Sequence, residues 1–153
     1  MRNVLPKYLP LAVTCATLAL LTGGCSQGTI ENIPTEAEFD RRVVDTAGPV
    51  LVDFYKDSCP TCVIQEGVLE NLAKDYGDQV KFVRFKIREV TMAGAAPEIM
   101  KRYDLFWVPT VILFVDGQEK ERWTLNHPAE AFRPALDKVT ARTAGETSAA
   151  PPQ

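Results

Sequence analysis

Two cysteines, Cys59 and Cys62, are separated by two residues and lie just after an apolar stretch, residues 49–56. In this C-x-x-C spacing one thiolate can attack a disulfide while the other thiol resolves the product. If a helix begins between residues 58 and 60, the unpaired N–H groups of its first turn favour a thiolate at Cys59, which should ionise below the ordinary cysteine pKa of about 8.5. Cys62 would lie one turn further on, on the same face, as the less exposed resolving thiol.

Three other uses of the cysteine pair have to be weighed. A structural disulfide that closes a loop of two residues constrains the unfolded chain very little. A zinc site needs two further ligands, and His127 is the single histidine of the chain. Cu(I) can be held by two thiolates alone, so a role in metal handling stays open. The pattern favours a redox couple, and it predicts no bound metal ion and no dissociable cofactor.

Hydrophobic periodicity predicts the elements that position this pair. Residues 49–56 are almost continuously apolar, which is typical of a buried strand, and the apolar residues after Cys62 recur at helical spacing up to Gly77. Asp116 and Gly117 between two short apolar runs are typical of a hairpin turn. The predicted order is helix, strand, helix, strand, helix, strand, strand, helix, over residues 35–46, 49–56, 58–76, 80–87, 97–103, 111–115, 118–123 and 128–140. A β-α-β unit followed by a hairpin predicts an α/β fold with a central mixed sheet and helices on both faces.

The first 24 residues have the features of an export signal. Arg2 and Lys7 precede an uncharged apolar segment, residues 9–21, which is too short to span a bilayer comfortably. The segment runs into LTGGCS, which resembles the lipobox of bacterial lipoproteins, where the signal is cut just before a cysteine, here Cys25, that then carries the lipid. An ordinary secretory signal with an incidental cysteine is the alternative. The lipoprotein interpretation predicts a protein anchored to a membrane of the bacterial cell envelope, facing the periplasm or the exterior, where disulfides persist.

Composition and patterning divide the chain into four parts. We expect a signal peptide over residues 1–24, a tether over 25–34, one globular domain over 35–140 and a disordered tail over 141–153, because TAGETSAAPPQ has no apolar period. A chain of 153 residues that is 46% hydrophobic and 24% charged fits one such domain. The net charge of -3 comes without a basic cluster, which argues against a nucleic-acid partner.

Three stretches that follow one another in the expected order resemble the thioredoxin family over about residues 35–139. They are VLVDFYKDSCPTC, WVPT and LFVDGQE. The resemblance implies a thioredoxin-like fold and a thiol:disulfide oxidoreductase with Cys59 as nucleophile and Cys62 as resolver. It also implies protein thiols and disulfides as substrates, and another thiol protein as electron donor or acceptor. The alternative is a thioredoxin-fold module that binds Cu(I) or an envelope assembly partner without turnover.

The resemblance assigns roles to residues outside the cysteine pair. Asp53 corresponds to the family's buried acid, which helps to deprotonate Cys62, and burial within VLVDFY would raise its pKa; a strand-end carboxylate paired with a neighbour is the alternative. Arg84 stands where the family commonly has a lysine, and it would pair with Asp53. Pro109 corresponds to the family's cis-proline, which faces the cysteines and leaves the Val108 backbone to pair with an extended substrate. A trans-proline that opens a strand is the alternative.

The chain also departs from the family's pattern. Ser58 replaces the usual tryptophan before the first cysteine, Pro60 and Thr61 replace Gly-Pro, and the glycine before the last helix is missing from WTLNHPAE. Trp107 is a candidate for the aromatic wall that Ser58 lacks, with a place in the core as the alternative. Because the dipeptide between the cysteines tunes the redox potential over about 150 mV in this fold, the direction of electron flow stays open.

Overall fold

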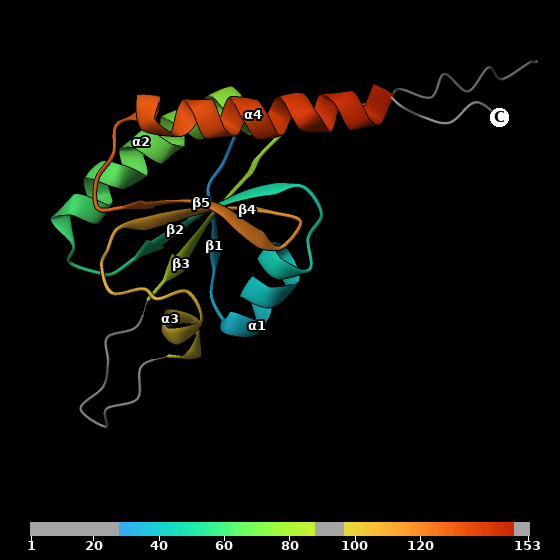
Figure 1. The fold of residues 1–153 in the computed structure, drawn as a ribbon. Helices are drawn as coiled ribbons and strands as arrows, with labels where there is room; N and C mark the ends of the chain where they lie inside the picture. The colour runs from blue at the N-terminus through green and yellow to red at the C-terminus, as the bar shows by residue number, and fades with distance from the viewer. Residues whose placement is uncertain (1–27, 88–96, 149–153) are drawn as a thin grey trace, which may run out of the picture.

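The computed structural model describes residues 28–87 and 97–148. Its strands are β1 (Glu31–Ile33), β2 (Pro49–Tyr55), β3 (Lys81–Lys86), β4 (Thr110–Val115) and β5 (Gln118–Thr124). They form one mixed sheet in the order β1-β3-β2-β4-β5 (Figure 1). β3 pairs in parallel with both β1 and β2, whereas β4 is antiparallel to β2 and to β5. β2 therefore lies at the centre, and the predicted α/β fold with a mixed sheet is confirmed.

Helices cover both faces of the sheet. They are α1 (Glu36–Phe39), the π-helix η1 (Asp40–Val44), α2 (Pro60–Tyr76), α3 (Glu98–Arg102) and α4 (Ala129–Ser148). Figure 1 shows α2 and α4 along one face, with α1 and α3 against the other. A crossover through α2 joins the parallel strands β2 and β3, which is the predicted β-α-β unit. In the hairpin between β4 and β5, Asp116 and Gly117 both have positive φ, the conformation that their residue types favour.

Each strand contributes side chains to two cores because successive residues point to opposite faces. On one face Val52 and Phe54 pack around Phe39, whose ring centroid lies 5.5–5.9 Å from those of four other aromatic residues. On the other face Leu51 packs with residues of α2 and α4. Asp53 is two residues after Leu51 in β2 and so faces the same way, toward α2. Because of this alternation, the buried carboxylate of Asp53 faces α2, the helix that begins at the cysteine pair.

The first predicted helix is shorter and less regular than expected. Residues 35–46 were predicted as one helix, but the chain makes four residues of α-helix and then five of π-helix. Thr35 caps the start, as the S/T-x-x-E pattern indicates, with its hydroxyl accepting from the Glu38 N–H at 3.2 Å. Phe39, the last residue of α1, and Val43, within η1, are both fully buried. The sequence predicted the cap, whereas no pattern in it indicated the change from α-helix to π-helix.

Both ends of the predicted domain need correction. The tether predicted over residues 25–34 contains β1, a three-residue strand that buries Ile33 and exists by pairing with β3. At the other end, α4 continues past residue 140 to Ser148, into the tail predicted as disordered. That prediction used apolar period alone, although Ala, Arg and Glu in this stretch favour helix. α4 also passes through Pro134, which leaves the Glu130 carbonyl without its usual helical donor.

The predicted signal peptide and the predicted lipid attachment at Cys25 lie outside the described residues. Within residues 28–87 and 97–148, no helix combines the length and the apolar character needed to cross a membrane.

Candidate active site

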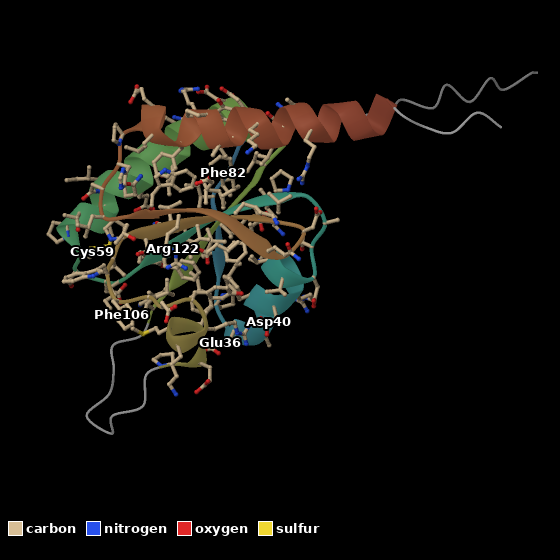
Figure 2. The ribbon with its side chains drawn as sticks, viewed as in Figure 1. Glu36, Asp40, Cys59, Phe82, Phe106 and Arg122 are labelled. Carbon is tan, nitrogen blue, oxygen red and sulfur yellow. A yellow bond between two sulfur atoms is a disulfide. The ribbon has the colours of Figure 1, made fainter. Side chains whose placement is uncertain are left out.

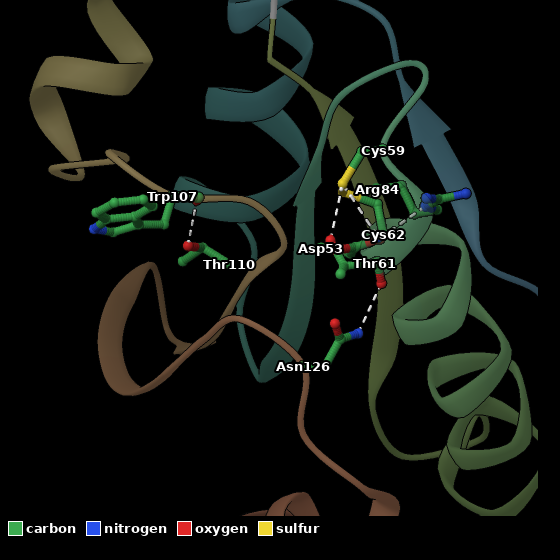
Figure 3. Close-up of a disulfide and its surroundings, with 8 residues drawn as sticks. All are labelled: Asp53, Cys59, Thr61, Cys62, Arg84, Trp107, Thr110 and Asn126. Atoms are coloured by element: carbon green, nitrogen blue, oxygen red, sulfur yellow. Dashed lines mark hydrogen bonds and ion pairs between the residues drawn. A yellow bond between two sulfur atoms is a disulfide. The ribbon is translucent and has the colours of Figure 1, made fainter.

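The cysteine pair lies at the junction of β2 and α2. A turn with Ser58 at φ 55° leads to Cys59, which is the N-cap of α2, and Pro60 takes the first helical position. Cys59 and Cys62 form a disulfide, with their Cα atoms 5.3 Å apart (Figure 3). The Cys62 N–H also donates to the Cys59 sulfur at 3.2 Å. The predicted helix start and the shared face of the two cysteines are therefore confirmed.

The two sulfur atoms have different surroundings. Cys62 is 2% exposed, whereas Cys59 is only partly buried. Both line an open cavity of about 410 Å³, together with Arg84 and Glu66. A substrate disulfide that enters this cavity meets the Cys59 sulfur first, since Cys62 lies behind it.

A buried ion pair lies on the inner side of the disulfide. Asp53 is fully buried, and its Oδ2 accepts from Arg84 Nε at 2.9 Å. Arg84 is held in turn by an ion pair with Glu66 and by the ring of Tyr55, whose centroid is 3.9 Å from the guanidinium carbon. We call Asp53, Arg84 and Glu66 the ionic cluster. It joins the buried carboxylate to the cavity that contains both cysteines.

Burial is the main influence on the pKa of Asp53, and the other two members of the ionic cluster modify it. Burial raises the pKa of Asp53 from 3.8 to about 6, while the Arg84 charge and hydrogen bond work in the opposite direction and Glu66 adds to the rise. Asp53 Oδ1 is buried and has no hydrogen-bond partner in the described part of the chain. A carboxyl group with a pKa near neutrality and one free oxygen is suited to take and return a proton.

The predicted substrate-binding residues take up different positions. The Val108–Pro109 peptide bond is cis, as the resemblance implies, and Pro109 is buried directly before β4. Trp107 is 66% exposed, so it has no place in the core, and Figure 3 shows its ring directed away from the disulfide. Its backbone carbonyl accepts from the Thr110 hydroxyl at 2.7 Å. Trp107 therefore does not form the aromatic wall beside Cys59 for which it was a candidate.

Sequence reasoning missed several contacts of the cysteine pair. The Thr61 hydroxyl lies 3.3 Å from the Cys59 sulfur, and Asn126 donates to the Thr61 carbonyl at 2.7 Å. Glu66, which holds Arg84, was also missed. The absence of the family glycine from WTLNHPAE marked the segment around Asn126 as unusual, but no sequence pattern links that segment to Thr61. No group of three His, Cys, Asp or Glu side chains suited to a metal ion occurs among the described residues.

A C-x-x-C disulfide at the start of the helix that follows a central strand, on a sheet of this topology, is the mark of the thioredoxin-like thiol:disulfide oxidoreductases. More narrowly, the chain belongs to the thioredoxin family, because the family model Thioredoxin matches residues 31–138. The family and the C-x-x-C pair identify the chain as a protein-disulfide oxidoreductase that acts on thiol proteins.

Individual relatives agree with this assignment. Thioredoxin 1 of Synechococcus elongatus is 32% identical over 104 residues, which are 68% of this chain and 92% of that protein. A thioredoxin of Staphylococcus aureus is 33% identical over the same shares of the two chains. Two solved structures support the fold. They are a Malassezia sympodialis thioredoxin (TM-score 0.62, 20% identity, 74% of this chain and 92% of that chain) and a mutant thioredoxin from Halobacterium salinarum (0.63, 24%, 77% and 96%).

Proposed function

We propose that the chain is a lipid-anchored thiol:disulfide oxidoreductase of the bacterial cell envelope, with Cys59 as nucleophile, Cys62 as resolving thiol and Asp53 as the proton acceptor for Cys62. The observation that carries the catalytic part is the asymmetry of the disulfide: Cys59 caps the helix and is reachable, whereas Cys62 is 2% exposed. Convergent N–H groups at a helix start favour the thiolate that attacks a disulfide.

Reduction of a substrate disulfide takes two exchanges. The Cys59 thiolate attacks one substrate sulfur, the substrate S–S bond breaks, and the departing substrate thiolate takes up a proton. Cys62 then loses its proton to Asp53 and attacks the Cys59 sulfur. The mixed disulfide breaks, the second substrate sulfur leaves as a thiolate, and the chain ends with the Cys59–Cys62 bond. In reverse, the same steps oxidise a dithiol, so one site serves either direction of electron flow.

Trapping of the mixed disulfide between Cys59 and a substrate is the direct test of this scheme. Cys62→Ser should accumulate mixed disulfides through Cys59, because the resolving thiol is absent, while Cys59→Ser is the matched control and should accumulate few. Both are measured by non-reducing electrophoresis and mass spectrometry after incubation with a disulfide peptide. Adducts equally frequent in the two variants would refute the assignment of nucleophile. Stoichiometric Cu(I) uptake without any disulfide exchange would instead favour the metal-binding alternative.

Strand direction supports an orientation for the anchored protein. β1 is parallel, through β3, to β2, and the cysteine pair follows the C-terminal end of β2. The N-terminal end of β1 therefore lies at the edge of the sheet away from the disulfide. Only five residues separate Cys25 from Glu31, which is a reach of at most about 20 Å. A lipid on Cys25 would hold the domain close to the membrane with its active site facing outward.

The anchor has its own test. Protein extracted from bacterial membranes should begin at Cys25 and carry the mass of acyl chains, and Cys25→Ala should carry no acyl chains and keep its uncleaved signal segment. The two cysteine variants at the active site serve as controls, since they should stay in the membrane. Recovery of an unmodified soluble form from the wild type would refute the lipid anchor and leave the redox assignment standing.

A further inference from the structure

The segment between β5 and α4 is hydrogen-bonded to the first turns of α2. The Asn126 side-chain amide donates to the Thr61 carbonyl at 2.7 Å, and the His127 N–H donates to Gln65 Oε1 at 2.8 Å (Figure 3 shows the first of these). Gln65 is fully buried, so its side chain is a fixed point of the helix. These two bonds bring a segment more than sixty residues distant in the chain against the dipeptide that separates the cysteines.

The residue held by Asn126 touches the Cys59 sulfur. The Thr61 hydroxyl lies 3.3 Å from Cys59 Sγ. Because that sulfur is in a disulfide and carries no hydrogen, the hydroxyl is the donor. The Cys62 N–H reaches the same sulfur from 3.2 Å. Two donors therefore converge on Cys59 Sγ, one from the backbone and one from a side chain.

Reduction of the disulfide changes the strength of the hydrogen bonds from these two donors to the Cys59 sulfur. A disulfide sulfur is a weak acceptor, whereas a thiolate is an anion, and hydrogen bonds to an ionised acceptor are about twice as strong as neutral ones. Donors already in place before reduction need no rearrangement when the charge appears. Thr61 is exposed and would otherwise exchange its hydroxyl partner for water, but its carbonyl is fixed from outside the helix.

We propose that Asn126 is a positioning residue which, by holding the Thr61 carbonyl, keeps the Thr61 hydroxyl aimed at the Cys59 sulfur and so stabilises the Cys59 thiolate. The inference rests on the proposed role of Cys59 as nucleophile. Thr61 lies between the two cysteines, whereas Asn126 lies outside the cysteine motif, in the segment where the family's glycine is missing. The expected consequence is a couple whose reduced form is favoured and whose nucleophile is ionised at lower pH.

The test follows the pH dependence of Cys59 alkylation in the fully reduced protein, by mass spectrometry, with the equilibrium against glutathione as second readout. Asn126→Ala and Thr61→Val should each move the midpoint upward by about half a pH unit and shift the glutathione equilibrium about threefold toward the disulfide. Thr61→Ser retains the hydroxyl and should stay near the wild type. Asn71→Ala is the control, because Asn71 is an exposed residue of α2 that bonds Lys74.

The double variant separates positioning from independent effects. If Asn126 acts through Thr61, then Thr61→Val with Asn126→Ala should shift the midpoint no further than Thr61→Val alone. A sum of the two single shifts, or an unchanged profile in Asn126→Ala, would overturn this inference alone. Alkylation of Cys62 ahead of Cys59 in the wild type would overturn the proposed nucleophile, and this inference with it.

Discussion

The two sides of the Cys59–Cys62 disulfide are held by different kinds of interaction. On the inner side, the ionic cluster of Asp53, Arg84 and Glu66 reaches a fully buried carboxylate. On the outer side, Thr61, Leu125 and Asn126 form an exposed rim of neutral hydrogen bonds (Figure 2 shows Cys59 near the surface). Charges out of water interact strongly, while exposed hydrogen bonds compete with solvent. We therefore expect large effects from the inner side, on Cys62, and small ones from the rim, on Cys59.

The largest effect should be on stability, and it should come from Asp53. Its pKa is raised from 3.8 to about 6 in the fold, so the native state holds a proton that the unfolded chain releases. The favourable contribution is complete below pH 3.8 and is lost as the pH rises through 6. Between about pH 3.5 and 7 the oxidised wild type should lose about 3 kcal/mol relative to Asp53→Asn, measured by urea unfolding.

The sign of this difference is what tests the ionic cluster. A carboxylate whose salt bridge outweighed its burial would have a lowered pKa, and the wild type would then gain stability with pH relative to Asp53→Asn. Asp75→Asn is the matched control, because Asp75 forms an exposed pair with Arg133. It should follow the wild type closely.

Asp53→Asn should also slow the second exchange about 100-fold, because the amide cannot accept the Cys62 proton. The measurement is release of a peptide thiol from a mixed disulfide preformed on Cys59. In the wild type this rate should rise with pH through about 6, as Asp53 ionises, and the variant should lack that rise. The first attack by Cys59 should change little. A variant in which both steps slow equally would show that Asp53 acts on the site as a whole.

Arg84→Met and Glu66→Gln should move the pKa of Asp53 in opposite directions. Arg84 opposes the effect of burial on Asp53 and Glu66 adds to it. Loss of the arginine should therefore raise this pKa above 6 by about one unit, and loss of the Glu66 charge should lower it by less. The carboxyl carbon of Asp53, followed by NMR titration, reports both. Shifts of the same sign would mean that the two substitutions act by rearranging Arg84 rather than through charge.

The inner side was largely predictable from sequence and the rim was not. Asp53, Cys59 and Cys62 lie in one continuous stretch whose apolar pattern sets a strand, a turn and a helix, so local rules place them. The position of Arg84 could be predicted from the parallel pairing of β2 with β3 alone, because Arg84 is opposite Asp53 in that pairing. Contacts between Asn126 and Thr61 depend instead on where a loop rests after the whole sheet has formed.

The same distinction accounts for the corrected boundaries. β1 is three residues long and has no periodic signal of its own, so its existence depends on the free edge of β3. The change from α1 to the π-helix η1 likewise has no signal in the sequence pattern. Elements that carry their own pattern, such as α2 with its Cys59 cap and the hairpin at Asp116 and Gly117, were predicted nearly to the residue.

The smallest effect should come from Leu125, and it separates the backbone of the rim from its hydrogen bonds. Leu125 has φ 67°, and its N–H donates to the Pro109 carbonyl at 2.8 Å. A left-handed backbone costs a residue with a Cβ about 1–2 kcal/mol, which glycine avoids. Part of that gain is offset by the greater freedom of glycine in the unfolded chain. Leu125→Gly should therefore be more stable than its control Leu125→Ala by about 0.5–1 kcal/mol in urea unfolding.

Both Leu125 variants should keep the wild-type pH profile of Cys59 alkylation, because the bond from Asn126 to Thr61 is untouched. Equal stability of the two would mean that the loop relaxes to another conformation, and a shifted profile would mean that this backbone, as well as Asn126, positions Thr61.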